Sequence, residues 1–133
     1  MMGDKGTFAT AINCEDGRTQ IPVWSWLTAH LNVDFIDTIT EPGVDKVLAM
    51  GSKAEVESIQ RCVLISFNAH HSRVVAIVGH HDCAGNPASK KEHLKHLEKC
   101  VRVVQSWNLP IDIITLWVNE DWAVELISEI KKP

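Results

Sequence analysis

Side chains that bind metals are concentrated in the segment GHHDC, residues 79–83, which directly follows the apolar run RVVAIVG (73–79). Histidine nitrogen and cysteine sulfur are the ligands that zinc prefers in proteins. One histidine and one cysteine do not complete a metal site, however, so further ligands must come from elsewhere in the chain. The segment NCEDGR (13–18) offers Cys14, with Asp16 and Arg18 close behind it. A zinc site built from both segments requires a fold that brings them together.

Apolar segments alternate with amphipathic ones along the whole chain. The segments typical of strands cover residues 7–13, 33–39, 73–79 and 111–118. Helical spacing follows each of them, and we place Pro22 at the first turn of the first helix. Two further helices begin with the spacing of a capping box, at residues 52–55 and 89–92. The segment DWAVELISEIKK (121–132) is predicted to form a closing helix.

This alternation predicts an α/β fold with a doubly wound, mainly parallel sheet of about four strands and helices on both faces. In the order 2-1-3-4, the first and third strands are neighbours and a crevice opens at their carboxyl ends. Cys14 would then lie close to His80 and Cys83. Because side chains alternate along a strand, Asp16 and Arg18 are expected on the same side as Cys14.

The two motifs together resemble those of the β-class carbonic anhydrases. The first is C-x-D-x-R at Cys14, Asp16 and Arg18, and the second is H-x-x-C at His80 and Cys83, about 60 residues later. The resemblance covers roughly residues 8 to 120. It implies that Cys14, His80 and Cys83 hold Zn²⁺. It also implies that Asp16, paired with Arg18, orients a water or hydroxide as the fourth ligand, or itself binds zinc in a resting form.

A zinc site with three protein ligands keeps one position open, as catalytic zinc sites do. The resemblance therefore implies reversible hydration of carbon dioxide to bicarbonate by zinc-bound hydroxide, with Asp16 and Arg18 as candidate catalytic residues. Two alternatives stay open. One is a hydrolase of carbonyl sulfide or carbon disulfide on the same scaffold. The other is a non-catalytic protein in which zinc only links the two strands.

Several residues outside this set have no assigned role. Family members usually carry Arg-Asn-Ala-Gly after the second strand, whereas this chain has Glu41-Pro42-Gly43, which puts an acid where a cation is usual. His81 lies between two ligands and could line the pocket or carry protons. The roles of Glu41 and His81 are left open. The family analogy favours a homodimer or a higher homo-oligomer.

The remaining histidines, cysteines and tryptophans are assigned to structure rather than to chemistry. His93 and His96 are three residues apart on a predicted helix, and we expect them on its solvent-exposed face. Cys100 is expected in the core. Trp117 and Trp122 flank the end of the fourth strand and either pack or wall a pocket.

Composition limits the class of protein. A chain of 133 residues with a formal net charge of −4 is predicted to form one domain, residues 1–133, and not to bind nucleic acid. No apolar run approaches the roughly 20 residues that span a bilayer. The N-terminus lacks the apolar core of a signal peptide, which favours the cytoplasm. A small molecule is the expected partner.

Overall fold

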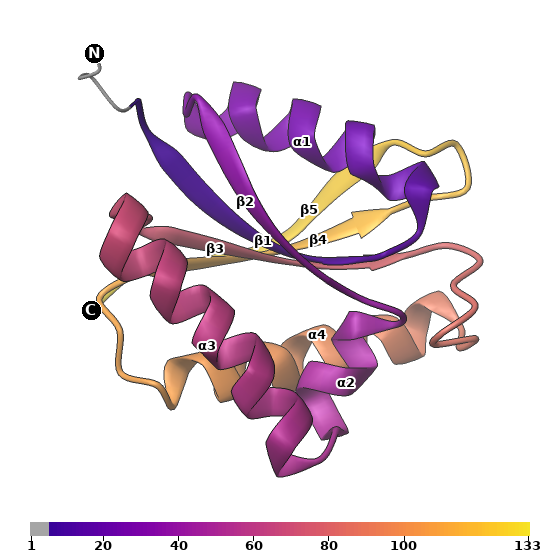
Figure 1. The fold of residues 1–133 in the computed structure, drawn as a ribbon. Helices are drawn as coiled ribbons and strands as arrows, with labels where there is room; N and C mark the ends of the chain where they lie inside the picture. Colours follow the sequence, from indigo (N-terminus) through magenta and orange to yellow (C-terminus); the bar gives the residue numbers. More distant parts are fainter. Residues whose placement is uncertain (1–5) are drawn as a thin grey trace.

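The computed structural model describes residues 6–133 and shows a five-stranded sheet with helices on both faces (Figure 1). The strands are β1 (Phe8–Cys14), β2 (Phe35–Glu41), β3 (Val74–His80), β4 (Asp112–Val118) and β5 (Val124–Ile130). The helices are α1 (Gly17–Leu31), α2 (Val44–Met50), α3 (Lys53–His70) and α4 (Lys90–Gln105).

The sheet has the order β2-β1-β3-β4-β5, and its first four strands are parallel. The predicted α/β class and the predicted order 2-1-3-4 are therefore confirmed. The pairing of β1 with β3 places Ile12 opposite Ile77, so the two strands end side by side. Their carboxyl ends carry the residues that the sequence analysis selected.

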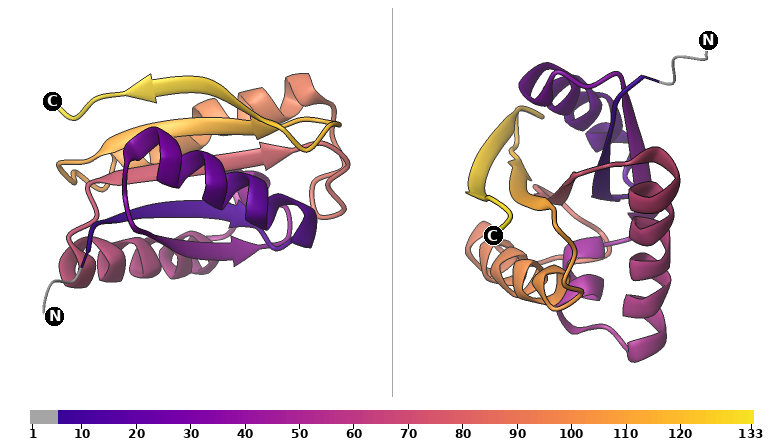
Figure 2. Two further views of the ribbon diagram at one scale, coloured as in Figure 1. Left: turned by 90° about the horizontal axis from the view of Figure 1, so that it is seen from above. Right: turned by 90° about the vertical axis from the view of Figure 1, so that its left-hand side faces the viewer.

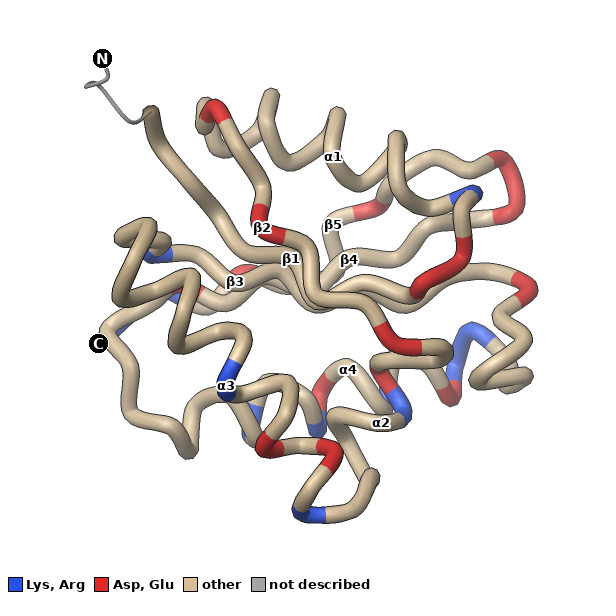
Figure 3. The backbone as a smooth tube through the Cα atoms, viewed as in Figure 1, with Lys and Arg blue, Asp and Glu red and all other residues tan. Residues whose placement is uncertain are grey.

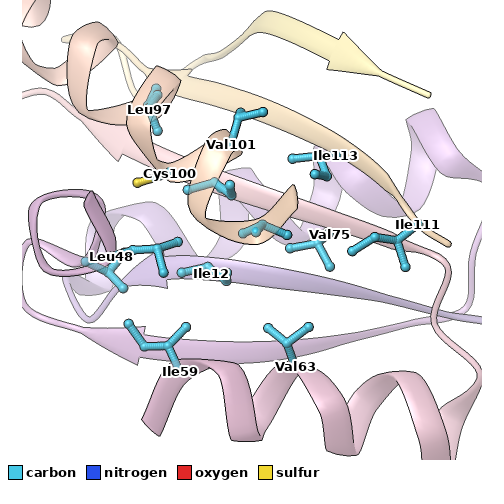
Figure 4. Packing of buried hydrophobic residues seen from close by; sticks show 13 residues of the cluster. Ile12, Leu48, Ile59, Val63, Val75, Leu97, Cys100, Val101, Ile111 and Ile113 are labelled. Atoms are coloured by element: carbon cyan, nitrogen blue, oxygen red, sulfur yellow. The ribbon is translucent and has the colours of Figure 1, made fainter. Parts of the chain in front are cut away.

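The two faces of the sheet pack against different helices. Helix α1 covers one face, and α2, α3 and α4 cover the other (Figures 1 and 2). The larger apolar cluster lies on the side of α2–α4 and includes Ile12, Val75 and Leu97 (Figure 4). The smaller cluster lies beneath α1 and includes Ala11 and Leu27. Because Ala11 and Ile12 are adjacent on β1 and point to opposite faces, both faces of the strand are apolar.

Side chains at the helix starts satisfy backbone N–H groups that have no partner inside the helix. Ser52 and Glu55 form the predicted capping box at α3, with bonds of 3.2 and 2.8 Å. Ser89 caps α4 by accepting from the Glu92 N–H. Asp16 caps α1 in the same way. Helix α1 therefore begins at Gly17, and Pro22 lies inside it rather than in its first turn, so the predicted start was wrong.

The C-terminal segment forms a strand, so the predicted closing helix at 121–132 is wrong. β5 runs antiparallel to β4 and becomes an edge of the sheet. Thr115 and Ser128 bond across the pair at 2.6 Å, and a register shift follows between Thr115 and Leu116. The shift places Val124 against the smaller cluster and Ile130 against the larger one. Pairing with the open edge of β4 thus outweighs the helical spacing of this segment.

Acidic residues are spread over strands, helices and loops, and basic residues do not form a basic face in the view of Figure 3. In the part of the chain that the structure describes, every helix is too short or too polar to cross a bilayer.

Candidate metal centre

Three potential metal ligands meet where β1 and β3 end. Cys14 is the last residue of β1, His80 is the last residue of β3, and Cys83 follows in the next loop. One ligand atom from each lies within 4.8 Å of the other two, and the two sulfurs are 3.9 Å apart. All three side chains are buried. Among residues 6–133 no other group of three or more such side chains comes this close together.

The imidazole of His80 is oriented with one nitrogen left over. Its Nδ1 donates to the carbonyl oxygen of His81 at 2.7 Å, which assigns the proton to Nδ1. Its Nε2 is buried and has no hydrogen-bond partner within residues 6–133. Buried polar atoms are rarely left unpaired, and a metal ion would satisfy this one. Two sulfurs and one imidazole nitrogen are a donor set that suits zinc.

The ionisation of the three groups is already linked. Contact with the Cys83 thiol lowers the pKa of Cys14, and the same contact raises the pKa of Cys83, so the two sulfurs share one proton. Burial lowers the pKa of His80, but the nearby Cys14 and the carbonyl of His81 raise it overall. A bound cation would favour the thiolate form of both cysteines.

Backbone and side-chain amide groups hold Cys14, the first of the potential ligands, in place. The N–H of Gly43 donates to Cys14 Sγ at 3.5 Å, and the side-chain amide of Gln20 donates to the Cys14 carbonyl at 2.8 Å. Gly43 also packs directly against Gly85, two residues after Cys83. No function was predicted for Gly43 or Gln20 from the sequence. The positive φ of Gly43, +58°, explains the glycine, but it became evident only in the structure.

Asp16 and Arg18 form a bidentate ion pair beside the three potential ligands. Asp16 Oδ1 accepts from the Arg18 backbone N–H at 2.9 Å and from Nε at 3.1 Å, while Oδ2 accepts from Nη2 at 2.7 Å. These bonds from Arg18 lower the pKa of Asp16 to about 2. The Asp16 carboxylate is therefore ionised. Its oxygens bond to the guanidinium, and it does not belong to the cluster of Cys14, His80 and Cys83.

The guanidinium of Arg18 also holds the loop after β3. Nη1 donates to Asp82 Oδ2 at 3.2 Å, and Nη2 donates to the Asp82 carbonyl at 3.1 Å. Asp82 has a left-handed backbone, with φ of 57°, which aspartate tolerates better than most residues. The Trp122 ring covers the guanidinium carbon at 4.4 Å. Trp122 was predicted to pack or to wall a pocket, and its contact with Arg18 was not predicted from the sequence.

A cleft of about 490 Å³ reaches the site from the loop side. Its lining includes the metal-ligand candidate Cys83, together with His81, Lys90 and Trp117. His81 is exposed at the mouth of this cleft. Glu41 is paired with Cys14 in the β1–β2 register, but its side chain is exposed.

His93 and His96 lie in the interior, so their predicted exposure was wrong. Their exposed fractions are 1% and 7%. His93 Nδ1 pairs with Asp45 Oδ2 at 2.5 Å, and the Asn86 amide lies 3.0 Å from His96 Nδ1 and donates to Asp45. Both histidines share the apolar stripe of Leu97 at helical spacing, but this spacing does not reveal the buried partners that allow two polar side chains to lie there.

Comparison with known proteins agrees with the residue pattern. A family model described as putative carbonic anhydrase matches residues 4–128. A carbonic anhydrase from Glaciozyma antarctica is similar in structure, with a TM-score of 0.54 and 14% identity, over 90% of this chain and 81% of that one. A tetrameric β-carbonic anhydrase from Sordaria macrospora has a TM-score of 0.55 and 11% identity, over 96% of this chain and 83% of that one. No curated protein matched the sequence.

Proposed function

Because this chain belongs to the putative carbonic anhydrase family, we propose that it is a zinc-dependent lyase for the reversible hydration of carbon dioxide to bicarbonate. One observation carries the proposal: the cluster of Cys14, His80 and Cys83 lies beside an ionised carboxylate that is held by an arginine. A structural zinc site would have four protein ligands and would gain nothing from that pair.

In the proposed site Cys14, His80 and Cys83 hold one zinc ion and leave one coordination position open. When bound, zinc supplies the Lewis acidity that makes water a nucleophile near neutral pH. The orphaned Nε2 of His80 supports its role as a ligand, as does the linked ionisation of the two cysteines.

Asp16 is proposed to orient the attacking water. An ionised carboxylate can only accept hydrogen bonds, so it binds the hydrogen of the attacking oxygen and turns a lone pair toward carbon dioxide. The three bonds from Arg18 fix the carboxylate and keep it ionised. They also hold it away from the metal, which keeps the open position available.

The metal assignment is tested first, by zinc analysis of the purified protein. We expect one zinc per chain in the wild type and greatly reduced zinc in Cys14→Ser, Cys83→Ser and His80→Ala. His81→Ala is the matched control, because it removes an adjacent imidazole that serves as no ligand, and it should keep its zinc. Zinc-free wild type, or full zinc in both serine variants, would contradict the assignment.

The reaction is tested by stopped-flow hydration of carbon dioxide, run beside sulfide release from carbonyl sulfide and carbon disulfide. We expect hydration to be the fastest of the three in the zinc-loaded protein. Faster sulfide release would replace the substrate assignment with a sulfur analogue on the same site. Zinc-loaded protein that turns over none of the three would favour the non-catalytic alternative.

We also propose that the chain forms a homo-oligomer. The Sordaria macrospora enzyme of similar fold is tetrameric. In this chain β2 is an edge strand, and Phe35 on it and Ile65 on the adjacent α3 are about half exposed. An apolar edge of this kind is suited to pairing with a second copy. Light scattering after size exclusion should give a mass above that of one chain, and a monomeric mass at micromolar concentration would contradict this.

A further inference from the structure

Trp122 occupies a backbone conformation that a large side chain rarely adopts. Its φ is +58°, in the left-handed region. The turn between β4 and β5 holds it there: the Trp122 N–H donates to the Asn119 carbonyl, and Asn119 Oδ1 accepts from the N–H groups of Asp121 and Ala123. Glycine or asparagine would adopt this conformation at lower cost. The indole must therefore make contacts that compensate for the strain.

The contacts of the indole are directed at the candidate centre. Its ring lies 4.4 Å from the guanidinium carbon of Arg18, and its centroid lies 6.4 Å from the ring centroids of both His80 and His81. The β4–β5 turn lies at the same end of the molecule as the start of α1 (Figures 1 and 2). The ring is half-buried and also packs on the apolar cluster beneath α1, which limits its movement.

The geometry of a guanidinium explains what this contact adds. Its N–H donors all lie in the plane of the group, and here they are directed to Asp16 and Asp82. Those bonds leave the two flat faces of the group uncovered. The Trp122 ring covers one of these faces. The ring attracts the cationic guanidinium and excludes water from that face. The side chain of Arg18 is still 47% exposed, so without the ring its bonds to Asp16 would compete more strongly with water.

We infer that Trp122 is a positioning residue that acts through Arg18, holding the guanidinium against Asp16 and so keeping that carboxylate aimed at the reacting water. This inference rests on the proposed function, because it assigns Trp122 to the same reaction. It makes the β4–β5 turn, which is remote in sequence from both motifs, a part of the site.

Two substitutions separate the aromatic face from simple packing. Trp122→Phe keeps a ring over Arg18, whereas Trp122→Leu keeps apolar volume without a ring, and both side chains meet the same backbone constraint. We expect kcat to fall about tenfold in Trp122→Leu, with KM and zinc content little changed, and to stay within about threefold in Trp122→Phe. Trp24→Leu is the matched control, because Trp24 is 53% exposed on α1, and it should keep the wild-type rate.

A second measurement does not depend on turnover. The chain has four arginines, so the Nε–H signals of a ¹⁵N spectrum can be resolved, and the Arg18 signal is the one lost in Arg18→Lys. In the wild type this proton bonds to Asp16, and the adjacent guanidinium carbon lies over the Trp122 ring. We expect its exchange with water to accelerate at least severalfold in Trp122→Leu and to stay near wild type in Trp122→Phe. If Trp122→Leu does not fold, Trp122→Asn, which suits the left-handed turn, takes its place.

The two measurements together decide the inference. Wild-type kcat in Trp122→Leu, or an unchanged Arg18 exchange rate, would overturn it, and so would equal losses in the Phe and Leu variants. A wild-type protein without any turnover would instead overturn the proposed function, while the exchange rate would still report whether Trp122 holds Arg18.

Discussion

The contact between Gly43 and Gly85 allows a sharp test of how the centre is held together. Gly43 is bonded through its N–H to Cys14 Sγ, and Gly85 lies two residues after Cys83, so this contact joins the segments of two proposed ligands. A Cβ on Gly43 would lie 2.4 Å from the Gly85 carbonyl carbon, whereas ordinary contact begins near 3.4 Å. The two segments must therefore separate by about 1 Å in Gly43→Ala.

That displacement is large on the scale of a metal site. Zinc–ligand distances hold to within about 0.2 Å, so a shift of about 1 Å in either segment disturbs the ligand set. We expect Gly43→Ala to lose zinc affinity by about 10- to 100-fold, the range found when groups that support metal ligands are removed. The positive φ at this position adds a cost of about 1–2 kcal/mol in the free energy of unfolding.

The assay is competition for zinc with a chromophoric chelator, combined with denaturant unfolding of each variant. Two other glycines serve as controls. Gly17→Ala introduces a Cβ with nothing within 4 Å and should bind zinc as the wild type does. Gly51→Ala introduces a 2.4 Å clash with the Val47 carbonyl, away from the proposed ligands, and should lose stability without losing zinc affinity. Wild-type zinc affinity in folded Gly43→Ala, or an equal loss in Gly51→Ala, would refute the reasoning.

Three further predictions concern rate, pH and stability. Asp16→Asn should keep its fold and its zinc but lose about a hundredfold in the rate of carbon dioxide hydration, because the neutral amide loses its charge-assisted bonds to Arg18 and cannot replace the carboxylate as an acceptor for the attacking water. An unchanged stopped-flow rate would contradict this. The wild-type rate should rise with pH around a midpoint above about 7, because two thiolates offset the charge of zinc. The pKa of Asp16 is lowered to about 2, so Asp16 is ionised throughout this pH range and the rise in rate is assigned to the zinc-bound water. Disappearance of the rise from the pH–rate profile of Asp16→Asn would count against this assignment. His93→Ala should lower the free energy of unfolding by about 3–5 kcal/mol, because it removes the imidazole partner of the buried Asp45 and leaves that carboxylate with hydrogen bonds from neutral groups alone. A loss below about 1 kcal/mol in urea unfolding would disprove that.

Much of the fold and the candidate centre was predictable because it depends on local patterns. Both signals are read from neighbouring residues: apolar runs of strand length identified the first four strands, and Ser–Glu pairs identified the starts of α3 and α4. The chirality rules of parallel sheets leave few possible strand orders, and in the predicted order the ends of β1 and β3 lie side by side. Once that order was set, Cys14, His80 and Cys83 had to lie close together.

Other features depend on contacts between segments remote in sequence, and only the tertiary structure decided them. The segment of β5 has helical spacing, but pairing with the exposed edge of β4 makes it a strand. His93 is polar, yet it is buried because Asp45 on another helix pairs with it. Trp122 contacts Arg18 because the β4–β5 turn folds back beside the start of α1. A sequence pattern records which surfaces are apolar, whereas the burial of a polar or strained residue depends on a partner that the fold alone supplies.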